Sequence, residues 1–449
     1  MSRAKEAALP FYLLLCILLG GSSQAIWGNA LLQLLAIGLL AWAALTRDPA
    51  PITTAGRRLL LIVAIAILLV MAQLIPLPPA VWTELPGREF IADGYALLDM
   101  PLPWLPISEA PYDTMSTALT LLPPLALLIA MLRLQHWRVS WLFGAVFVAT
   151  AISVFLGALQ VSAGDGNWYF YRRTNLGVAV GPFANGNHLA TMLLAAIPLL
   201  TALVVQKRRL AAGKGDRSID LVLGVAAGCI ILIGLLINRS AAMVILGPAV
   251  VAATAVMAMR LSPRRKRQGM LLAIGLLAAA AAVVVLAGKS LPSMGTTASI
   301  ETRGEYWSTS LPAVQDQWLT GSGFGTFVQT YRRYEDPQIA DRWFTNHAHN
   351  DYLELAIEGG AAALLVLLAF LLWWAGRARD SWSHETGTIE QKAAAVASAA
   401  ILLHSLFDYP LRTAGIAAIF AVCLALLAGA RGAGSRAAAG SEQARHATL

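Results

Sequence analysis

Long apolar runs dominate this sequence and restrict what it can fold into. Twelve of them have roughly the length that crosses a bilayer as a helix, about 17–25 residues. Asp, Glu, Lys and Arg make up only 13% of the 449 residues, about half of what a soluble domain carries. The expected spans are 8–22, 25–46, 59–75, 114–132, 139–162, 187–206, 219–237, 241–259, 269–288, 356–375, 393–407 and 413–430.

A helical bundle is the architecture that fits these runs. Backbone groups left unpaired in lipid are costly, so chains cross membranes as helices or as closed barrels. The runs lack the alternation of apolar and polar residues that barrel strands show. The sequence therefore predicts an all-α polytopic membrane protein with about 12 transmembrane helices.

The distribution of basic residues predicts the orientation. Cytoplasmic loops of membrane proteins carry an excess of Lys and Arg. With the N-terminus inside and alternating spans, 23 of the 33 basic residues but only 8 of the 25 acidic ones fall in cytoplasmic segments. Both termini are thus expected in the cytoplasm. The net charge of +8 then reflects topology, and no nucleic-acid partner is expected.

Two long segments are expected on the outer side. Residues 76–113 are rich in Pro and Trp, as an interfacial loop would be. Residues 289–355 contain amphipathic pieces near 301–319 and many aromatic residues, so an ordered cap is expected. The predicted organisation is helices 1–5 in 1–163, helices 6–9 in 164–288, a large periplasmic catalytic loop in 289–355, helices 10–12 in 356–430 and a disordered cytoplasmic tail in 431–449.

Polar residues crowd the stretch RWFTNHAHNDYLELAIEGG, residues 342–360, directly before an apolar run. One interpretation is a metal site made of His347, His349, Asp351 and Glu354. Zinc-binding histidines, however, are usually found at helical spacing. A second interpretation is that Asn350 or Asp351 only caps the next helix. We favour a third, acid–base chemistry, because a histidine at the membrane surface can take up a proton near neutral pH.

Arginines on the predicted outer side could bind phosphate. Planar guanidinium groups hold phosphate oxygens through paired hydrogen bonds. Arg239 lies in a tight outer hairpin, and Arg303 opens the amphipathic part of the large outer loop. Either could also be an ordinary solvated or headgroup-contacting residue. Further candidates of the same kind are Arg172, Arg173, Arg332 and Arg333. Together they suit a lipid diphosphate whose tail lies in the bilayer.

Four motifs follow one another over roughly residues 165–360. VGPFANGNHLA has the pattern G-x-F-x-N-x-N-x-x-A, through Gly181, Phe183, Asn185, Asn187 and Ala190. NRSAAM begins the outer hairpin, and TRGEYWSTSLPAVQDQWLTGSGFGTF combines R-x-x-x-W with G-x-G-x-G. HNDYLELAIEGG has the pattern HN-x-x-L-x-x-x-x-E-x-G, through His349, Asn350, Leu353, Glu358 and Gly360. In order and spacing, the set resembles the O-antigen ligase and repeat-unit polymerase family of bacterial inner membranes.

The resemblance implies a metal-independent, cofactor-free glycosyltransferase whose active site faces the periplasm. Its donor would be an oligosaccharide on undecaprenyl diphosphate. Its acceptor would be another glycan in a polymerase, or lipid A–core or a protein hydroxyl in a ligase. The last third of the chain, including HSLFDYPLRT, looks closer to exopolysaccharide polymerases. The resemblance assigns diphosphate binding to Arg239 and Arg303, to which we add Arg173, and it assigns the base to His349.

These assignments give each residue of the predicted site a role. His349 takes the proton from the acceptor hydroxyl, and Glu358 braces the site or orients the histidine. The arginines stabilise the charge that grows on the leaving phosphate. The supporting residues are His347, Asn350, Asn185 and Asn187. A lipid or polysaccharide transporter is the alternative from another class. Transporters tend to place polar groups near the bilayer midplane, whereas these gather at one face.

Overall fold

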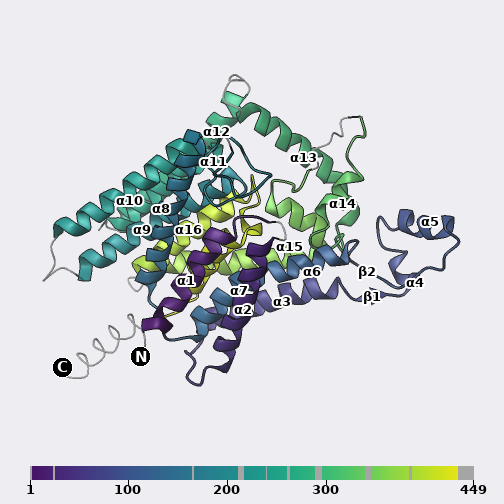
Figure 1. Ribbon diagram of the computed structural model, residues 1–449, viewed down its shortest axis with the longest axis horizontal. Coiled ribbons are helices and arrows are strands. Elements are labelled where there is room, and N and C mark those ends of the chain that lie inside the picture. The colour runs from purple at the N-terminus through teal and green to yellow at the C-terminus, as the bar shows by residue number, and fades with distance from the viewer. Residues whose placement is uncertain are drawn as a thin grey trace.

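The computed structural model of the protein is almost entirely helical in the parts of the chain that it describes (Figure 1). The single sheet in these parts pairs two strands of two residues each. The described residues are 3–23, 26–163, 166–210, 217–238, 240–259, 263–288, 296–338, 345–383 and 387–432.

Helices occur at all twelve predicted spans, and the prediction of an all-α fold is confirmed. The bundle consists of α1 (Arg3–Leu19), α2 (Trp27–Leu45), α3 (Thr54–Ala72), α6 (Pro111–Thr120), α7 (Leu122–Arg133), α8 (Val139–Ala163), α9 (Gly186–Leu210), α10 (Arg217–Asn238), α11 (Ala241–Ala258), α12 (Pro263–Gly288), α15 (Asp351–Ser383), α16 (Ile389–His404) and α17 (Ala414–Leu427). Among the described residues, seven helical stretches are long and apolar enough to cross a membrane. A count of twelve spans and their orientation remain predictions.

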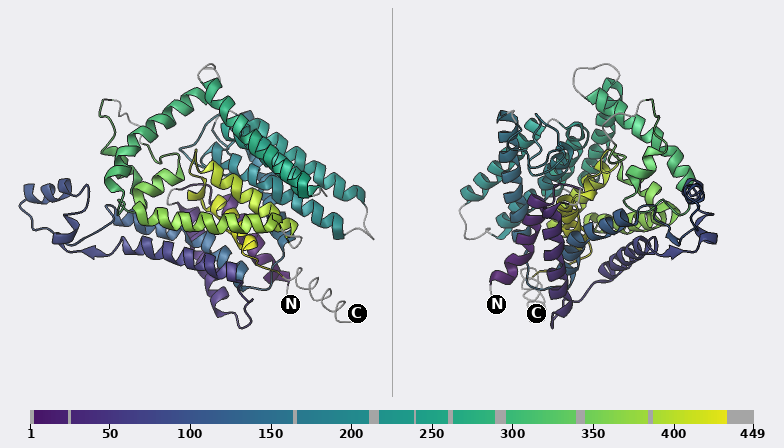
Figure 2. Two further views of the ribbon diagram at one scale, coloured as in Figure 1. Left: turned by 180° about the vertical axis from the view of Figure 1, so that it is seen from behind. Right: turned by 45° about the vertical axis from the view of Figure 1, so that its right-hand side comes forward.

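Helix α9 lies at the centre of the bundle. In its apolar window 72% of the residues are buried, whereas no other candidate span exceeds 44%. It packs against α8, α10, α11 and α16 (Figures 1 and 2). Alanines such as Ala195 and Ala196 on α9 and Ala393 and Ala397 on α16 are fully buried. Small side chains let helices approach closely in a membrane, so this pair forms a rigid base for the loops at its ends.

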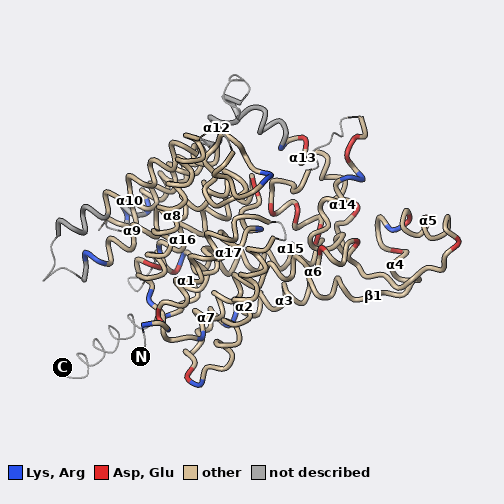
Figure 3. The backbone as a smooth tube through the Cα atoms, in the orientation of Figure 1, with Lys and Arg blue, Asp and Glu red and all other residues tan. Residues whose placement is uncertain are grey.

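Apart from the short 3-10 helix at Pro410–Arg412, the remaining elements gather at one end of the bundle (Figure 1, right). They are β1 (Pro76–Leu77), α4 (Pro79–Trp82), α5 (Glu89–Leu97), β2 (Leu105–Pro106), α13 (Thr296–Gln317) and α14 (Phe327–Arg332). Figure 3 shows many of the acidic residues at this end, in α13, just after α14 and in the segment around α5. These elements occupy the two segments for which the sequence predicts the outer side, 76–113 and 289–355.

Helix α15 is broken at Gly360, which has a φ of 58° and a ψ of −155°. The break is held by the glycine-rich turn GSGFG, because the Ser322 and Gly323 amides donate to the carbonyls of Ile357 and Glu358 at 3.0 Å each. A Cβ atom on Gly360 would lie 2.7 Å from the Gly321 nitrogen. Non-helical backbone at membrane depth is tolerated where it is buried in protein or lines a cavity. The break separates a short outer part of α15 from its long apolar part.

Replacing Gly360 should therefore destabilise the protein. Gly360→Ala adds a side chain to a left-handed backbone and a blocked position, a strain of about 1–3 kcal/mol. Gly376 lies in the same helix with open space around its Cβ position, so Gly376→Ala should be neutral or stabilising. Thermal unfolding of both purified variants in the same detergent measures the difference. Equal midpoints would contradict this account of the break.

Candidate active site

Asp408 is a fully buried carboxylate between α16 and the short helix η2 (Pro410–Arg412). Its Oδ1 accepts a hydrogen bond of 2.8 Å from the backbone amide of Tyr409. Its Oδ2 accepts one of 2.5 Å from Nδ2 of Asn187, at the start of α9. Asn187 is itself held, because its Oδ1 accepts from the Ser240 hydroxyl at 2.8 Å. The carboxylate is thus fixed between α9, the start of α11 and η2.

Three side chains that can carry positive charge surround this carboxylate. His188 Nε2 lies 3.7 Å and His349 Nδ1 lies 3.5 Å from Oδ1, and Arg303 Nη2 lies 3.7 Å from Oδ2. Burial alone would raise the pKa of Asp408, but interactions with His188 and His349 hold it well below its usual range. Asp408 is therefore an anion that can fix the orientation of an imidazole and stabilise its protonated form.

Helix α13 forms one wall of this cluster. Positions three and four residues apart lie on the same face of a helix, so Arg303, Tyr306 and Trp307 project together. The His349 ring stacks on Tyr306 with centroids 5.7 Å apart, and Trp307 Nε1 donates to the Ala348 carbonyl at 3.0 Å. His349 has a φ of 49°, a left-handed conformation that non-glycine residues adopt only where the surroundings hold it.

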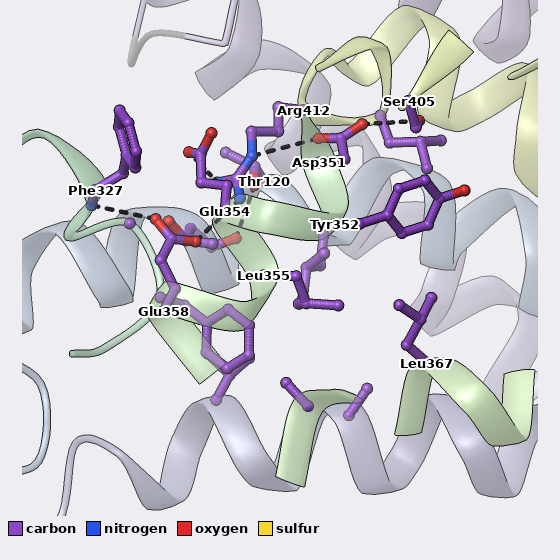
Figure 4. Close-up of a pocket in the computed structure, with 18 of the residues that line it drawn as sticks. Thr120, Phe327, Asp351, Tyr352, Glu354, Leu355, Glu358, Leu367, Ser405 and Arg412 are labelled. Atoms are coloured by element: carbon purple, nitrogen blue, oxygen red, sulfur yellow. Dashed lines mark hydrogen bonds and ion pairs between the residues drawn. The ribbon is translucent and has the colours of Figure 1, made fainter. Parts of the chain in front are cut away.

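A second polar network is centred on Arg412 and lies at the start of α15. Its guanidinium contacts three carboxylates on the first two turns of α15 (Figure 4). The distances are 3.5 Å to Asp351, 3.1 Å to Glu354 and 3.0 Å to Glu358. Glu358 also accepts from the Phe327 amide at 3.3 Å. The carboxylates raise the pKa of Arg412 against the effect of burial, so Arg412 carries a permanent charge.

His347 connects the two networks. Its Nδ1 lies 2.9 Å from Glu354 Oε1, and its Nε2 lies 3.1 Å from the Ser23 hydroxyl. The other oxygen of Glu354 accepts from the Ala348 amide at 3.1 Å. The His347 ring is 4.0 Å from that of Tyr409, which in turn lies 5.0 Å from the ring of His349. Glu354 therefore fixes the backbone directly before His349.

A cavity of about 670 Å³ adjoins the second network (Figure 4). Its polar end includes His347 and the carboxylates around Arg412. Its apolar part lies between α3, α15 and α17. None of Arg303, His349 and Asp408 lines it.

The structure brings several of the predicted site residues together. Arg303 and His349 share the Asp408 carboxylate, and Asn187 holds it. Asn350 caps α15, because its Oδ1 accepts from the amides of Tyr352 and Leu353 at 3.0 and 3.1 Å. The capping interpretation and the acid–base interpretation are therefore compatible.

Other predicted residues lie elsewhere. Glu358 contacts Arg412 and Phe327, and the carboxylate beside His349 is Asp408 instead. Asn185 accepts a hydrogen bond of 2.9 Å from the backbone amide of Asn187. Arg173 is exposed in the segment before α9 and is not among the described contacts of Asp408. Arg239 lies outside the described residues.

The predicted metal set is divided between different partners. His347 pairs with Glu354, His349 with Asp408, and Asp351 with Arg412 and Ser405. Within the described part of the chain, no group of three or more His, Cys, Asp or Glu residues is arranged to hold a metal ion.

Sequence reasoning missed Asp408, His188 and Arg412 as site residues. Asp408 and Arg412 are charges in a short connection between the last two apolar runs, the same signal that singled out Arg239. His188 stands inside the motif VGPFANGNHLA, beside two asparagines that were named. The spacing along the chain gave no indication that these residues meet Arg303 and His349.

Comparison with protein families supports the sequence motifs. Residues 223–368 match the family model described as O-antigen ligase. This match places a domain of the O-antigen ligase type in residues 223–368. The match covers about a third of the chain and contains Arg303 and His349, whereas Asn187, His188 and Asp408 lie outside it. No curated protein matches the chain significantly. A domain of this type indicates a membrane enzyme of the glycosyltransferase type, acting on a lipid-linked glycan and an acceptor.

The environment of His347 predicts how stability depends on pH. Burial lowers the pKa of His347 below its ordinary value of about 6.5 despite the nearby Glu354. Below about pH 6.5 the His347 side chain therefore binds a proton more readily in the unfolded chain than in the folded protein. The free energy of unfolding consequently falls as the pH falls. Thermal unfolding between about pH 7.5 and 5.5 should show this decline, and His347→Gln should reduce it. His136→Gln is the control, and an unchanged slope in His347→Gln would contradict the assignment.

Proposed function

We propose that this protein transfers a glycan from undecaprenyl diphosphate to an acceptor hydroxyl at the periplasmic face of the bacterial inner membrane. One observation carries the proposal, namely that Arg303 and His349 share the buried carboxylate of Asp408. A phosphate-binding group and a proton-accepting group thereby lie within one cluster, as transfer from a lipid diphosphate requires. The reaction needs no nucleotide, because the bond to diphosphate already activates the anomeric carbon.

Arg303 acts on the donor. Its side chain is 18% exposed, so it is partly accessible to a ligand. As the bond between the anomeric carbon and the diphosphate oxygen breaks, the electron pair stays on that oxygen. A fixed guanidinium stabilises this developing charge. Arg239 and Arg173 complete the proposed diphosphate site.

His349 acts on the acceptor. Because Nδ1 faces Asp408, Nε2 is the nitrogen that takes the proton from the acceptor hydroxyl. The acceptor oxygen forms the new bond to the anomeric carbon as the diphosphate leaves. Asp408 stabilises the imidazolium that results. The products are the elongated glycan and undecaprenyl diphosphate, with the proton held on His349 until it is released.

The acceptor we propose is a further lipid-linked repeat unit, which makes the enzyme a polysaccharide polymerase. The resemblance of the last third of the chain to exopolysaccharide polymerases supports this choice. Asp408 and Arg412, which complete the two networks, lie in that part of the chain. Ligation to lipid A–core or to a protein hydroxyl would use the same donor chemistry.

Purified protein in liposomes, supplied with one lipid-linked repeat unit as both donor and acceptor, tests this function. The wild type should produce longer lipid-linked chains. His349→Ala should lower the rate by about two to four orders of magnitude, the usual effect of a positioned base, without loss of donor binding. Arg303→Ala should nearly abolish transfer, and Arg303→Lys should restore little because the planar fork is lost.

The matched controls are His136→Ala and Arg47→Ala, the latter at an exposed arginine between α2 and α3; both lie outside the cluster and should retain activity. Near-normal transfer by folded His349→Ala or Arg303→Ala protein would refute the assigned chemistry. Activity that appears only when lipid A–core or a protein acceptor is added would instead identify a ligase.

A further inference from the structure

The cavity at the break in α15 is separate from the cluster around Asp408. It is lined from α3, α6, both parts of α15 and α17. Figure 4 shows Asp351, Glu354 and Glu358 on the outer part of α15, with Leu367 on the part beyond the break. Because Gly360 turns the helix, one cavity receives polar groups from the outer part and apolar groups from the long part.

The inner portion of the cavity is shaped for a hydrocarbon chain. Among its described lining residues are Ile62, Val63, Ala66, Leu69, Leu355, Val366, Leu367, Phe370 and Phe420. These belong to helical stretches that are long or apolar enough to lie within a membrane. Each methylene group of a ligand that is buried against such walls contributes about 0.8 kcal/mol to the free energy of binding.

The outer portion carries an excess of carboxyl groups. Asp113, Asp351, Glu354 and Glu358 all line it, and Arg412 is the one Arg or Lys among the described lining residues. Burial lowers the pKa of His347, which favours its neutral form. Hydroxyl side chains of α6, from Ser116, Thr117 and Thr120, complete this end. Carboxylate oxygens accept hydrogen bonds from hydroxyl groups but repel phosphate at short range.

We propose that this cavity is a second lipid site, which takes an amphiphile with an uncharged, hydroxyl-bearing head such as a sugar. The hydrocarbon chain lies between α3 and the inner part of α15, and the hydroxyls bind the carboxyl groups around Arg412. The excess of carboxyl groups over basic groups disfavours a lipid diphosphate, so this site and the donor site select different lipids. The inference goes beyond the proposed transfer reaction and does not depend on it.

The site adjoins the candidate active site through His347. A hydroxyl at the polar end lies beside this side chain, whose ring contacts Tyr409. Tyr409 in turn contacts His349 at 5.0 Å between ring centroids. A bound lipid is therefore separated from the candidate base by the rings of His347 and Tyr409.

Native mass spectrometry of the full chain, with two amphiphiles of equal chain length, tests the site. The probes are dodecyl glucoside, which is neutral, and dodecyl phosphate, which is anionic. The glucoside should bind at least about tenfold more tightly, as repulsion by an excess of carboxylates predicts. Asp113→Asn removes one of these charges and should reduce the preference.

Two tryptophan variants on α3 localise the binding. Ala66 lines the cavity, so Ala66→Trp fills its apolar part. It should reduce glucoside binding by about tenfold or more, because the hydrocarbon chain loses apolar surface against which it would be buried. Ala64 is exposed on the same helix and does not line the cavity. Ala64→Trp is therefore the matched control and should bind as the wild type does.

The outcomes separate the alternatives. Equal binding of the two probes, equal effects of the two tryptophan variants, or absence of a glucoside adduct would each overturn the proposal. Tighter binding of dodecyl phosphate would assign the cavity to the phosphate-bearing donor instead. Failure of the transfer assay would leave these binding results unchanged, so the two proposals fail independently.

Discussion

The carboxylate of Asp408 draws separate parts of the chain into one place. Asn187 and His188 come from the start of α9, Arg303 from α13 and His349 from the segment before α15. A buried carboxylate without partners would be strongly unfavourable. Each of these contacts therefore helps to keep Asp408 in place, and through it the other partner residues. The positions of Arg303 and His349, which are proposed to act on the donor and on the acceptor, both depend on this single anion.

The network around Arg412 has a different task. Charges within a helical membrane bundle are costly and are kept where function or architecture requires them. Arg412 binds three carboxylates on one face of α15, and Glu354 extends this network to His347 and the Ala348 amide. The break at Gly360 and the GSGFG turn position that face. A stiff framework thus holds His349 in its left-handed conformation while the cavity remains open beside it.

The sequence predicted the helical bundle well, because apolar length and composition are properties of each segment alone. It also singled out His349 and Arg303, since a histidine and an arginine near apolar runs are conspicuous. Asp408 was missed although it stands in a similar position, because its importance lies in contacts with residues far away along the chain. Sequence reasoning assigned Glu358 the role of bracing the site or orienting the histidine, and in the structure its carboxylate contacts Arg412, just before the break in α15. Backbone breaks of this kind depend on tertiary contacts.

An experimental structure of the full chain with a polyprenyl diphosphate analogue would test the central claim most directly. The account predicts phosphate oxygens within hydrogen-bond distance of the Arg303 guanidinium, with the imidazole of His349 still beside Asp408. The anomeric position of the analogue should then lie on the Nε2 side of His349. Density for the diphosphate in the cavity next to Arg412, with Arg303 and His349 free of it, would contradict the account.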